Sequence, residues 1–272
     1  YPDNELEVDG LVRTWAMYVP QAHDGMTPVP LWLHFHGGAQ VASTTEVLRV
    51  AADEGFVLAA PQGIRNQGGS DKTWRWGDED AAIDFTAANP DIALTDALID
   101  QIGAELCVDL ARVYAAGWSS GAEASSVLAC TLDDRIAAVA PVAGIYDLGA
   151  ACEAERAVPH LSLIGTDDIW FAGLAPVAWS EHPIPQALAS GHHIDRTAAV
   201  AVRHGCEPDP VVEVVMDGVE RLTWSCPPGA DVALIVIEDG VHAWQPGWQA
   251  VGDWYDTSEA VWEFFERHPM PE

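Results

Sequence analysis

A serine between two glycines is the feature of this sequence whose residue types and spacing best suit chemistry. Residues 117–121 read GWSSG, which follows the pattern G-x-S-x-G. They lie between an apolar stretch at 112–116, which predicts a strand, and an alanine-rich stretch at 121–131, which predicts a helix. A nucleophile elbow needs this strand–turn–helix context, because its glycines remove side chains that would clash in a strained turn. We therefore expect Ser119 to be a nucleophile, and the glycine spacing selects it over Ser120.

Two further loops offer the partners that such a serine needs. A serine hydroxyl becomes nucleophilic when a histidine takes its proton and a carboxylate orients the histidine. In a fold with this elbow, the expected chain order is serine, acid and histidine, each beyond a strand end. A predicted strand at 161–164 is followed by Gly-Thr-Asp-Asp at 165–168, which supplies the acid, and one at 232–237 is followed by His242. The sequence thus predicts an acid at Asp167 or Asp168 and His242 as the base.

The other histidines of the second half carry no such pattern. His160 begins a predicted strand, whereas His192, His193 and His204 lie on or beside a predicted surface helix. Their spacings suggest no metal site, so we expect structural roles.

A small-residue loop after another predicted strand suits an oxyanion hole. His36-Gly37-Gly38 ends the apolar stretch at 31–35, and glycines let backbone N–H groups approach a developing negative charge. One donor is expected to be the N–H of Ser120, just past the nucleophile. The other is expected from Gly38, with Ala39 as the second choice.

The elements that must position these residues alternate along the chain. Alternating strands and helices predict an α/β fold with a mostly parallel sheet covered on both faces. No internal repeat or linker interrupts the pattern, so we expect one domain over residues 1–272. The predicted strands cover 11–19, 31–36, 56–60, 112–116, 136–142, 161–164 and 232–237; the helices cover 44–54, 94–106, 121–131, 186–204 and 258–267; and 62–90 is a loop long enough to be functional.

The charge balance restricts the class of partner. The chain has 42 Asp plus Glu against 12 Lys plus Arg, for a net charge of −30. Such a field repels phosphate backbones and anionic lipid head groups, so we expect no nucleic-acid or acidic-membrane partner. No stretch reaches the roughly 18 apolar residues of a membrane span. Adaptation to saline water and drift in genome composition both remain open as sources of the acidity.

The cysteines favour an oxidising compartment. The five cysteines include no C-x-x-C pair, and Cys206 and Cys226 flank a predicted hairpin at 211–224, which makes them a plausible disulfide. The pairing of Cys107, Cys130 and Cys152 stays open. The start at Tyr1 shows no signal-peptide pattern and reads as that of a mature chain. We expect a secreted or extracytoplasmic protein.

These residues resemble the family of secreted α/β-hydrolase esterases that includes polyhydroxybutyrate depolymerases, feruloyl esterases and acetylxylan esterases. The similarity extends over most of the chain and is particularly close at 107–122, at 137–144 and around Cys206 and 224–226. It implies a single-domain α/β-hydrolase without a metal or cofactor. Where such esterases read G-T-x-D and G-G-H-T-W-P, this chain has residues 165–168 and 240–246, which implies Asp168 as the acid and His242 as the base.

Three departures from the family pattern affect the substrate more than the triad. Val241 replaces a glycine, Gln245 is inserted before a proline, and Ile164 stands where a histidine is common. The resemblance implies a small-molecule or polymeric ester as substrate and leaves open which ester it is. We expect a monomer. A serine peptidase and a non-catalytic polymer- or carbohydrate-binding protein on the same fold are the alternatives.

Tryptophans suggest where an aromatic or sugar ring would bind. Trp118 lies beside the predicted nucleophile, Trp244 beside the predicted histidine, and Trp74 on the long loop. Exposed indoles stack well on flat rings, so we expect these three residues to be substrate contacts.

Overall fold

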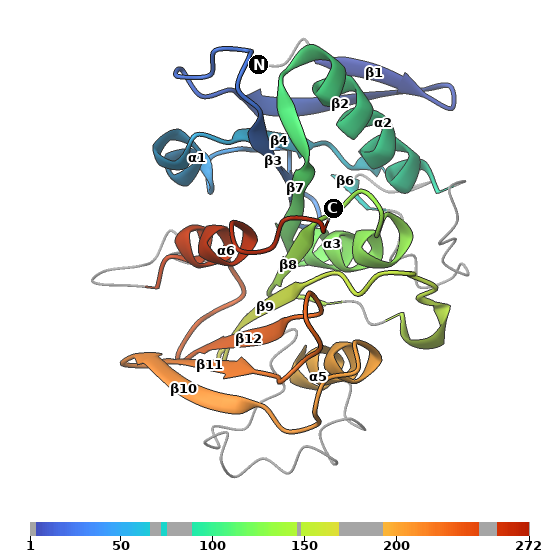
Figure 1. Ribbon diagram of the computed structural model, residues 1–272. Coiled ribbons are helices and arrows are strands. Elements are labelled where there is room, and N and C mark those ends of the chain that lie inside the picture. Colours follow the sequence, from blue (N-terminus) through green and yellow to red (C-terminus); the bar gives the residue numbers. More distant parts are fainter. Residues whose placement is uncertain are drawn as a thin grey trace.

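Six parallel strands form the centre of a ten-stranded sheet in the computed structural model, which describes residues 4–65, 72–74, 89–145, 148–168, 193–244 and 255–271 (Figure 1). In sheet order the central strands are β4 (Val57–Pro61), β3 (Val29–Phe35), β7 (Val108–Trp118), β8 (Ala138–Val142), β9 (His160–Gly165) and β12 (Val232–Ile237). Antiparallel strands complete both edges: β2 (Leu11–Tyr18) and β1 (Glu5–Val8) beside β4, and β11 (Val219–Thr223) and β10 (Val211–Met216) beside β12.

Burial explains why the central strands are nearly continuous apolar runs. Every residue of β4, β8, β9 and β12 is buried, since helices cover both faces of a parallel sheet. The edge strand β10 is the opposite case, with all six residues exposed. Asp168 and His242 follow the fully buried strands β9 and β12, and Ser119 follows β7, whose second half is buried.

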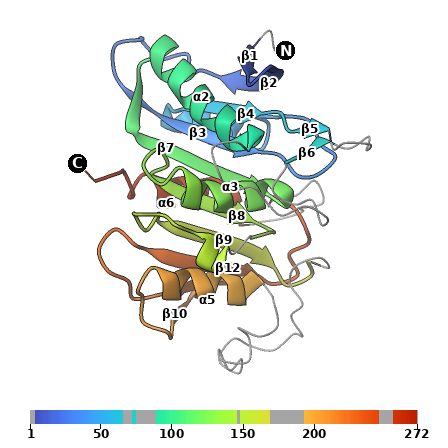
Figure 2. The same cartoon turned by 90° about the vertical axis from the view of Figure 1, so that its right-hand side faces the viewer.

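The helices lie in two layers. Figures 1 and 2 show α1 (Leu48–Glu54) and α6 (Thr257–Phe265) on one face of the sheet, and α2 (Pro90–Glu105), α3 (Ser120–Thr131) and α5 (His193–Arg203) on the other. The shorter elements are the 3₁₀ turn η1 (Gly149–Ala151) and the two-stranded pair β5 (Ile64–Arg65) and β6 (Lys72–Thr73).

The predicted alternation is confirmed, and the differences lie at element boundaries. The strand at 232–237 has the predicted bounds, whereas α2 begins at Pro90 rather than 94. The Asn89 side chain accepts the Asp91 N–H and proline occupies the first turn, two start signals that lay within the segment interpreted as loop. Strand β1 and the pair β5–β6 were not predicted. The part of the predicted helix at 186–192 lies outside the described residues.

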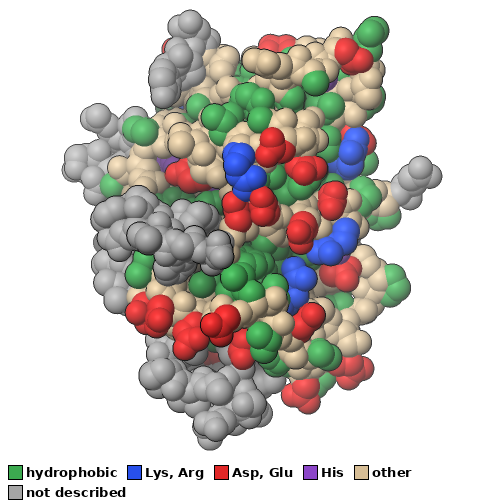
Figure 3. All heavy atoms as spheres, turned by 90° about the vertical axis from the view of Figure 1, so that its left-hand side faces the viewer, with side chains coloured by type: hydrophobic (Ala, Val, Ile, Leu, Met, Phe, Trp, Pro, Cys, Tyr) green, Lys and Arg blue, Asp and Glu red, His purple; other side chains and the backbone are tan. Residues whose placement is uncertain are grey.

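Acidic residues dominate the surface, and several of the few arginines pair with them. Figure 3 shows scattered Lys and Arg among more numerous Asp and Glu on the face that carries α1 and α6. Arg49 contacts Asp256 at 2.5 Å and Glu259 at 2.8 Å there, and Arg13 forms a fully buried pair with Asp91 at 2.6 Å. Within the described ranges, no helix is long and apolar enough to span a bilayer.

Two disulfides join segments about 20 residues apart. The structure has the predicted Cys206–Cys226 bridge, which closes the hairpin β10–β11 against the end of α5. The second bridge joins Cys130 in α3 to Cys152 after η1, a pairing that the sequence left open, and Cys107 remains a free thiol.

Candidate active site

Ser119 occupies a strained turn between β7 and α3. Its backbone has φ 56° and ψ −124°, values that non-glycine residues rarely adopt and that cost of the order of 1–3 kcal/mol. The Ser119 N–H donates to the Val142 carbonyl of β8 at 3.0 Å, and its own carbonyl accepts the first bonds of α3. The surrounding sheet thus holds this residue at the carboxyl end of β7, as the G-x-S-x-G pattern predicts.

The two glycines of the motif are required by close backbone packing. A Cβ on Gly117 would lie 2.4 Å from the Phe35 carbonyl oxygen, and one on Gly121 would lie 2.0 Å from the same atom. The end of strand β3 therefore packs directly against the turn, next to both glycines that flank Ser119. Any larger residue at either position would separate β3 from β7.

Asp168 and His242 meet across two loops at the carboxyl ends of β9 and β12. The His242 Nδ1 lies 2.8 Å from Asp168 Oδ2, and the carboxylate is fully buried while the imidazole is 18% exposed. Asp167 instead donates its backbone N–H to the Gly240 carbonyl. Of the two predicted acids, Asp168 is the one that contacts the histidine.

The loops carrying the acid and the histidine are tied together by their backbones. A Cβ on Gly165 would lie 2.0 Å from the Gly240 carbonyl oxygen, so the two chains touch where β9 and β12 end. The Thr166 hydroxyl accepts the Asp239 N–H at 2.9 Å. These contacts fix the spacing of Asp168 and His242 before their side chains meet.

Trp118 links the acid–histidine pair to the serine. Its ring packs on the His242 ring with centroids 5.1 Å apart, and the residue directly precedes Ser119. A Cβ on Gly37 would lie 3.0 Å from the same indole, so the predicted oxyanion loop passes just beneath it. The serine turn, the histidine and the glycine loop thus converge around one tryptophan.

The glycine loop brings two free backbone donors together. A Cβ on Gly38 would lie 3.6 Å from the Ser120 Oγ, which places the two residues next to each other. Ser120 is the first residue of α3, so its N–H has no acceptor within the helix. Among the described residues, the Gly38 N–H has no acceptor either. Two such N–H groups are what an oxyanion hole requires.

Trp74 and Trp244 were predicted to contact the substrate, but in the structure both side chains are buried in the core. Trp74 is 2% exposed and donates its indole N–H to the His36 carbonyl at 2.8 Å. Trp244 is 6% exposed and donates to the Ser258 hydroxyl. Neither ring offers a free face to a ligand in this structure, whereas Trp118 is only partly buried. Sequence position alone does not reveal this difference, because tertiary contacts decide exposure.

Two titratable groups near the candidate site were not predicted as part of it. His193, interpreted as a residue beside a surface helix, is 1% exposed, and burial lowers the pKa of its imidazole to about 3 despite the nearby Asp168 carboxylate. Glu123 lies one helical turn after Ser119, and burial raises the pKa of its carboxyl to about 7 although Arg196 opposes the shift. The His193 imidazole is therefore uncharged at neutral pH although Asp168 is near. The Glu123 carboxyl gains or loses its charge around pH 7.

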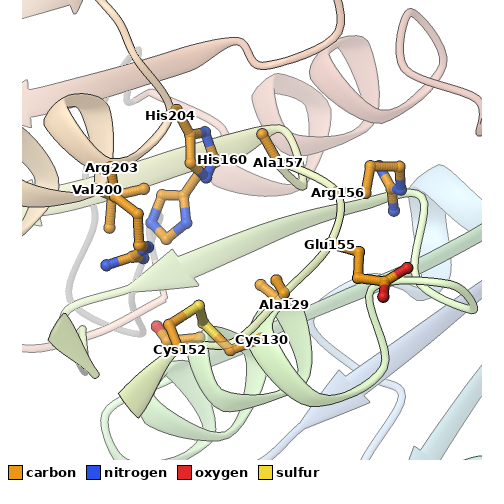
Figure 4. Close-up of a pocket in the computed structure, with 12 residues that line it drawn as sticks. Ala129, Cys130, Cys152, Glu155, Arg156, Ala157, His160, Val200, Arg203 and His204 are labelled. Atoms are coloured by element: carbon orange, nitrogen blue, oxygen red, sulfur yellow. A yellow bond between two sulfur atoms is a disulfide. The ribbon is translucent and has the colours of Figure 1, made fainter. Parts of the chain in front are cut away.

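A separate cavity of about 250 Å³ lies between α3, α5 and the start of β9 (Figure 4). The disulfide Cys130–Cys152 and the rings of His160 and His204 line it, and none of Ser119, Asp168 or His242 does. Burial lowers the pKa of both histidines, and Arg203 adds to the effect. The guanidinium of Arg156 is engaged with backbone carbonyls such as those of Asp133 and Ile136.

The described residues show no metal-binding arrangement. No group of three or more His, Cys, Asp or Glu side chains in the described part of the chain is placed to hold a metal ion.

The chain matches the profile of one protein family and several named relatives. The sequence profile described as Esterase PHB depolymerase matches residues 13–165, more than half of the chain. Feruloyl esterase B of Piromyces equi is 29% identical over 265 residues, which cover 93% of this chain and 44% of that protein. Feruloyl esterase C of Emericella nidulans is 24% identical over 262 residues, covering 93% and 83%. The chain therefore spans less than half the length of the first relative.

Solved structures show the same fold. An acetyl xylan esterase from Aspergillus awamori superposes with a TM-score of 0.60 at 13% identity, covering 93% of this chain and 94% of that one. An S-formylglutathione hydrolase from Agrobacterium tumefaciens gives a TM-score of 0.56 at 15% identity, covering 98% and 94%. These likenesses confirm the predicted α/β-hydrolase fold.

Proposed function

Since this chain belongs to the Esterase PHB depolymerase family, we propose that it is a serine carboxylic-ester hydrolase with Ser119, His242 and Asp168 as its triad. The observation that carries the proposal is the 2.8 Å contact between His242 and a buried Asp168, beside a serine in a strained elbow. A buried carboxylate on Nδ1 holds the imidazole in the tautomer whose Nε2 accepts a proton.

The reaction proceeds in two acyl-transfer steps. His242 Nε2 takes the proton of the Ser119 hydroxyl as Oγ attacks the carbonyl carbon of the ester, and the carbonyl oxygen becomes an oxyanion. The N–H groups of Ser120 and Gly38 stabilise that oxyanion. The intermediate then expels the alcohol, which receives the proton from His242, and leaves an acyl-serine.

Water completes the cycle. His242 takes a proton from the water molecule as its oxygen attacks the acyl carbon, and a second oxyanion forms in the same hole. Its collapse returns the proton to Ser119 Oγ and releases the carboxylic acid. Asp168 stays ionised throughout and stabilises the imidazolium that forms in each step.

We propose an extracellular ester as substrate. The relatives named as feruloyl esterases and the structural neighbour named as an acetyl xylan esterase support esters that decorate plant polysaccharide, with polyesters as the further class that the family name suggests. Two disulfides support folding in an oxidising compartment. Trp118 is the aromatic side chain in position to contact the substrate, since it is partly buried and adjoins His242.

Matched serine variants test the triad. Ser119→Ala and Ser120→Ala should both fold, because each removes one hydroxyl, but only the first should abolish hydrolysis of p-nitrophenyl acetate and methyl ferulate. Labelling of wild-type protein with a fluorophosphonate, followed by peptide mass spectrometry, should place the adduct on Ser119. Equal activity of the Ser119→Ala variant and wild type would reject the nucleophile. Folded wild-type protein that neither labels nor hydrolyses any ester would favour a non-catalytic binding role.

A further inference from the structure

His36 forms hydrogen bonds on both sides of its ring, one of them to the glycine loop. Its Nε2 lies 3.0 Å from the backbone N–H of Gly63, and its Nδ1 lies 2.7 Å from the carbonyl oxygen of Gly37. The side chain is 3% exposed, so these bonds form away from solvent. The ring thus connects the loop after β3 to the loop after β4.

The backbone contacts define the tautomer of this histidine. A backbone N–H is always a donor, so the Nε2 that faces Gly63 must be the acceptor and the ring proton must sit on Nδ1. Gln62 agrees with this arrangement: its Oε1 accepts the Ala42 N–H at 2.9 Å, which turns its amide NH₂ group toward His36 Nε2 at 2.8 Å. His36 is therefore a neutral ring that donates from Nδ1 to the Gly37 carbonyl.

The bond to Gly37 determines where the next N–H points. The Gly37 carbonyl and the Gly38 N–H belong to one planar, trans peptide unit, so they point in opposite directions. Holding the carbonyl against the His36 ring turns the Gly38 N–H away from that ring. Glycines on both sides of this peptide bond would otherwise let it rotate easily, because they lack the side chains that restrict φ and ψ.

Three more hydrogen bonds keep the loop in this conformation. The Gly37 N–H donates to the Gln40 side chain at 3.3 Å, and the Gln40 N–H donates back to the Gly37 carbonyl at 3.4 Å. The Trp74 indole N–H donates to the carbonyl of His36 itself. Ala39 has φ 60°, so the turn is held in a conformation that an alanine seldom adopts without support.

We propose that His36 is a positioning residue that sets the oxyanion hole, by holding the Gly37 carbonyl and thereby directing the Gly38 N–H toward the oxyanion. This inference rests on the proposed function, because the direction of that N–H matters only if Ser119 attacks an ester. His36 touches no reacting atom and acts through the Gly37–Gly38 peptide unit. Hydrolysis then depends on a histidine outside the triad.

Two amide variants separate the hydrogen bond at Nδ1 of the ring from the contacts at Nε2. In His36→Asn the side-chain amide occupies the place of Nδ1 and can still donate to the Gly37 carbonyl. In His36→Gln the amide reaches the place of Nε2, where it can accept from Gly63, and the bond to Gly37 is lost. We expect kcat of the Gln variant to fall about 100-fold or more with little change in KM, the loss typical of one oxyanion donor.

The Asn variant is the rescue control. Its kcat should stay within about tenfold of wild type, although loss of the Gly63 contact should lower its Tm. Equal kcat losses in both variants, or a Gln variant with wild-type kcat, would overturn the proposed role of His36. Absence of fluorophosphonate labelling and ester hydrolysis in wild-type protein would instead reject the proposed function, so the two failures are distinguishable.

A measurement on wild-type protein remains decisive if a variant fails to fold. In a spectrum of protein labelled with ¹⁵N-histidine at neutral pH, His36 should show the pattern of the Nδ1–H tautomer, the less common form of a neutral histidine. An Nε2–H tautomer or an imidazolium at this position would contradict the proposed bond to Gly37.

Discussion

The serine half of the candidate site and its acid–histidine half are held by different kinds of contact. Ser119 is fixed by main-chain packing in the middle of the sheet, where Gly121 lies directly against the Phe35 carbonyl and the Ser119 N–H bonds to β8. Asp168 and His242 lie on loops beyond β9 and β12. These loops are joined by a few contacts of residues 165–167 with 239 and 240, and the acid reaches the histidine through one side-chain hydrogen bond. Changes to the main-chain packing of the first half should therefore affect folding, and changes to the contacts of the second should affect catalysis.

The largest effect is expected from Gly121→Ala. The added Cβ would lie 2.0 Å from the Phe35 carbonyl oxygen and 2.7 Å from that of His36, backbone atoms at the end of the central strand β3 and just after it. Neither atom has room to move in a close-packed core, so the variant should yield no folded, active protein. Circular dichroism melting and ester hydrolysis measure the outcome.

Gly103→Ala is the matched control for this prediction. It makes the same change within α2, where the new Cβ meets the flexible end of Leu110 at 3.3 Å. Replacing a mid-helix glycine stabilises by roughly 0.5–1 kcal/mol, so this variant should melt at or above the wild-type temperature. A Gly121→Ala variant that melts like Gly103→Ala would refute the main-chain account of the serine half.

In the acid–histidine half, Asp168→Asn should reduce kcat by about 10⁴-fold while leaving the melting temperature nearly unchanged. The amide keeps the shape of the carboxylate but favours the wrong tautomer of His242 and cannot stabilise an imidazolium. Asp167→Asn is the neighbouring control, since Asp167 is exposed and it is Asp168 that bonds to the histidine. A variant of Asp167 that loses as much activity as that of Asp168 would reassign the acid.

A smaller loss is expected when the backbone contact between the two loops is disturbed. Gly165→Ala would place a Cβ 2.0 Å from the Gly240 carbonyl, which must shift and carry the loop of His242 with it. A displacement of about 1 Å at a catalytic group can cost about 100-fold in rate. We expect a kcat loss of that order in a protein that still folds, measured by steady-state kinetics beside a thermal melt. If the Gly165→Ala variant does not fold, the acid–histidine half depends on main-chain packing as much as the serine half does.

This difference also explains how much of the site the sequence could predict. The triad candidates follow strands that are recognisable as apolar runs in the sequence. The glycines of the elbow indicate positions where the backbones pack too closely for a side chain. The hydrogen bonds of His36 were not predictable, because they join residues 36 and 63 across two strands and depend on ring orientation. Trp74 and Trp244 were predicted to be substrate contacts from their place in the sequence, but their burial depends on tertiary packing, which the sequence does not show. The Cys130–Cys152 bridge likewise needed the approach of η1 to α3.

The smallest effect is expected from Glu123→Gln, a change beside the serine that leaves its backbone untouched. Burial raises the pKa of Glu123 from 4.5 to about 7 in the folded state, so between these values the folded protein holds a proton that the unfolded chain has lost. The stability of the wild type should therefore fall as pH rises from about 4.5 to 7 and stay reduced above 7.

The Gln variant cannot ionise at this position, so relative to wild type it should gain on the order of 2 kcal/mol at pH 8 and less than about 1 kcal/mol at pH 5. Urea unfolding at both pH values measures the difference, with Glu213→Gln on the exposed strand β10 as the control that should show no pH-dependent gain. A gain of the same size at pH 5 and pH 8 would mean that the charge of Glu123 is not responsible. A gain that is much larger at pH 8 than at pH 5 would show that the ionised Glu123 carboxylate, one turn from Ser119, lowers the stability of the folded protein.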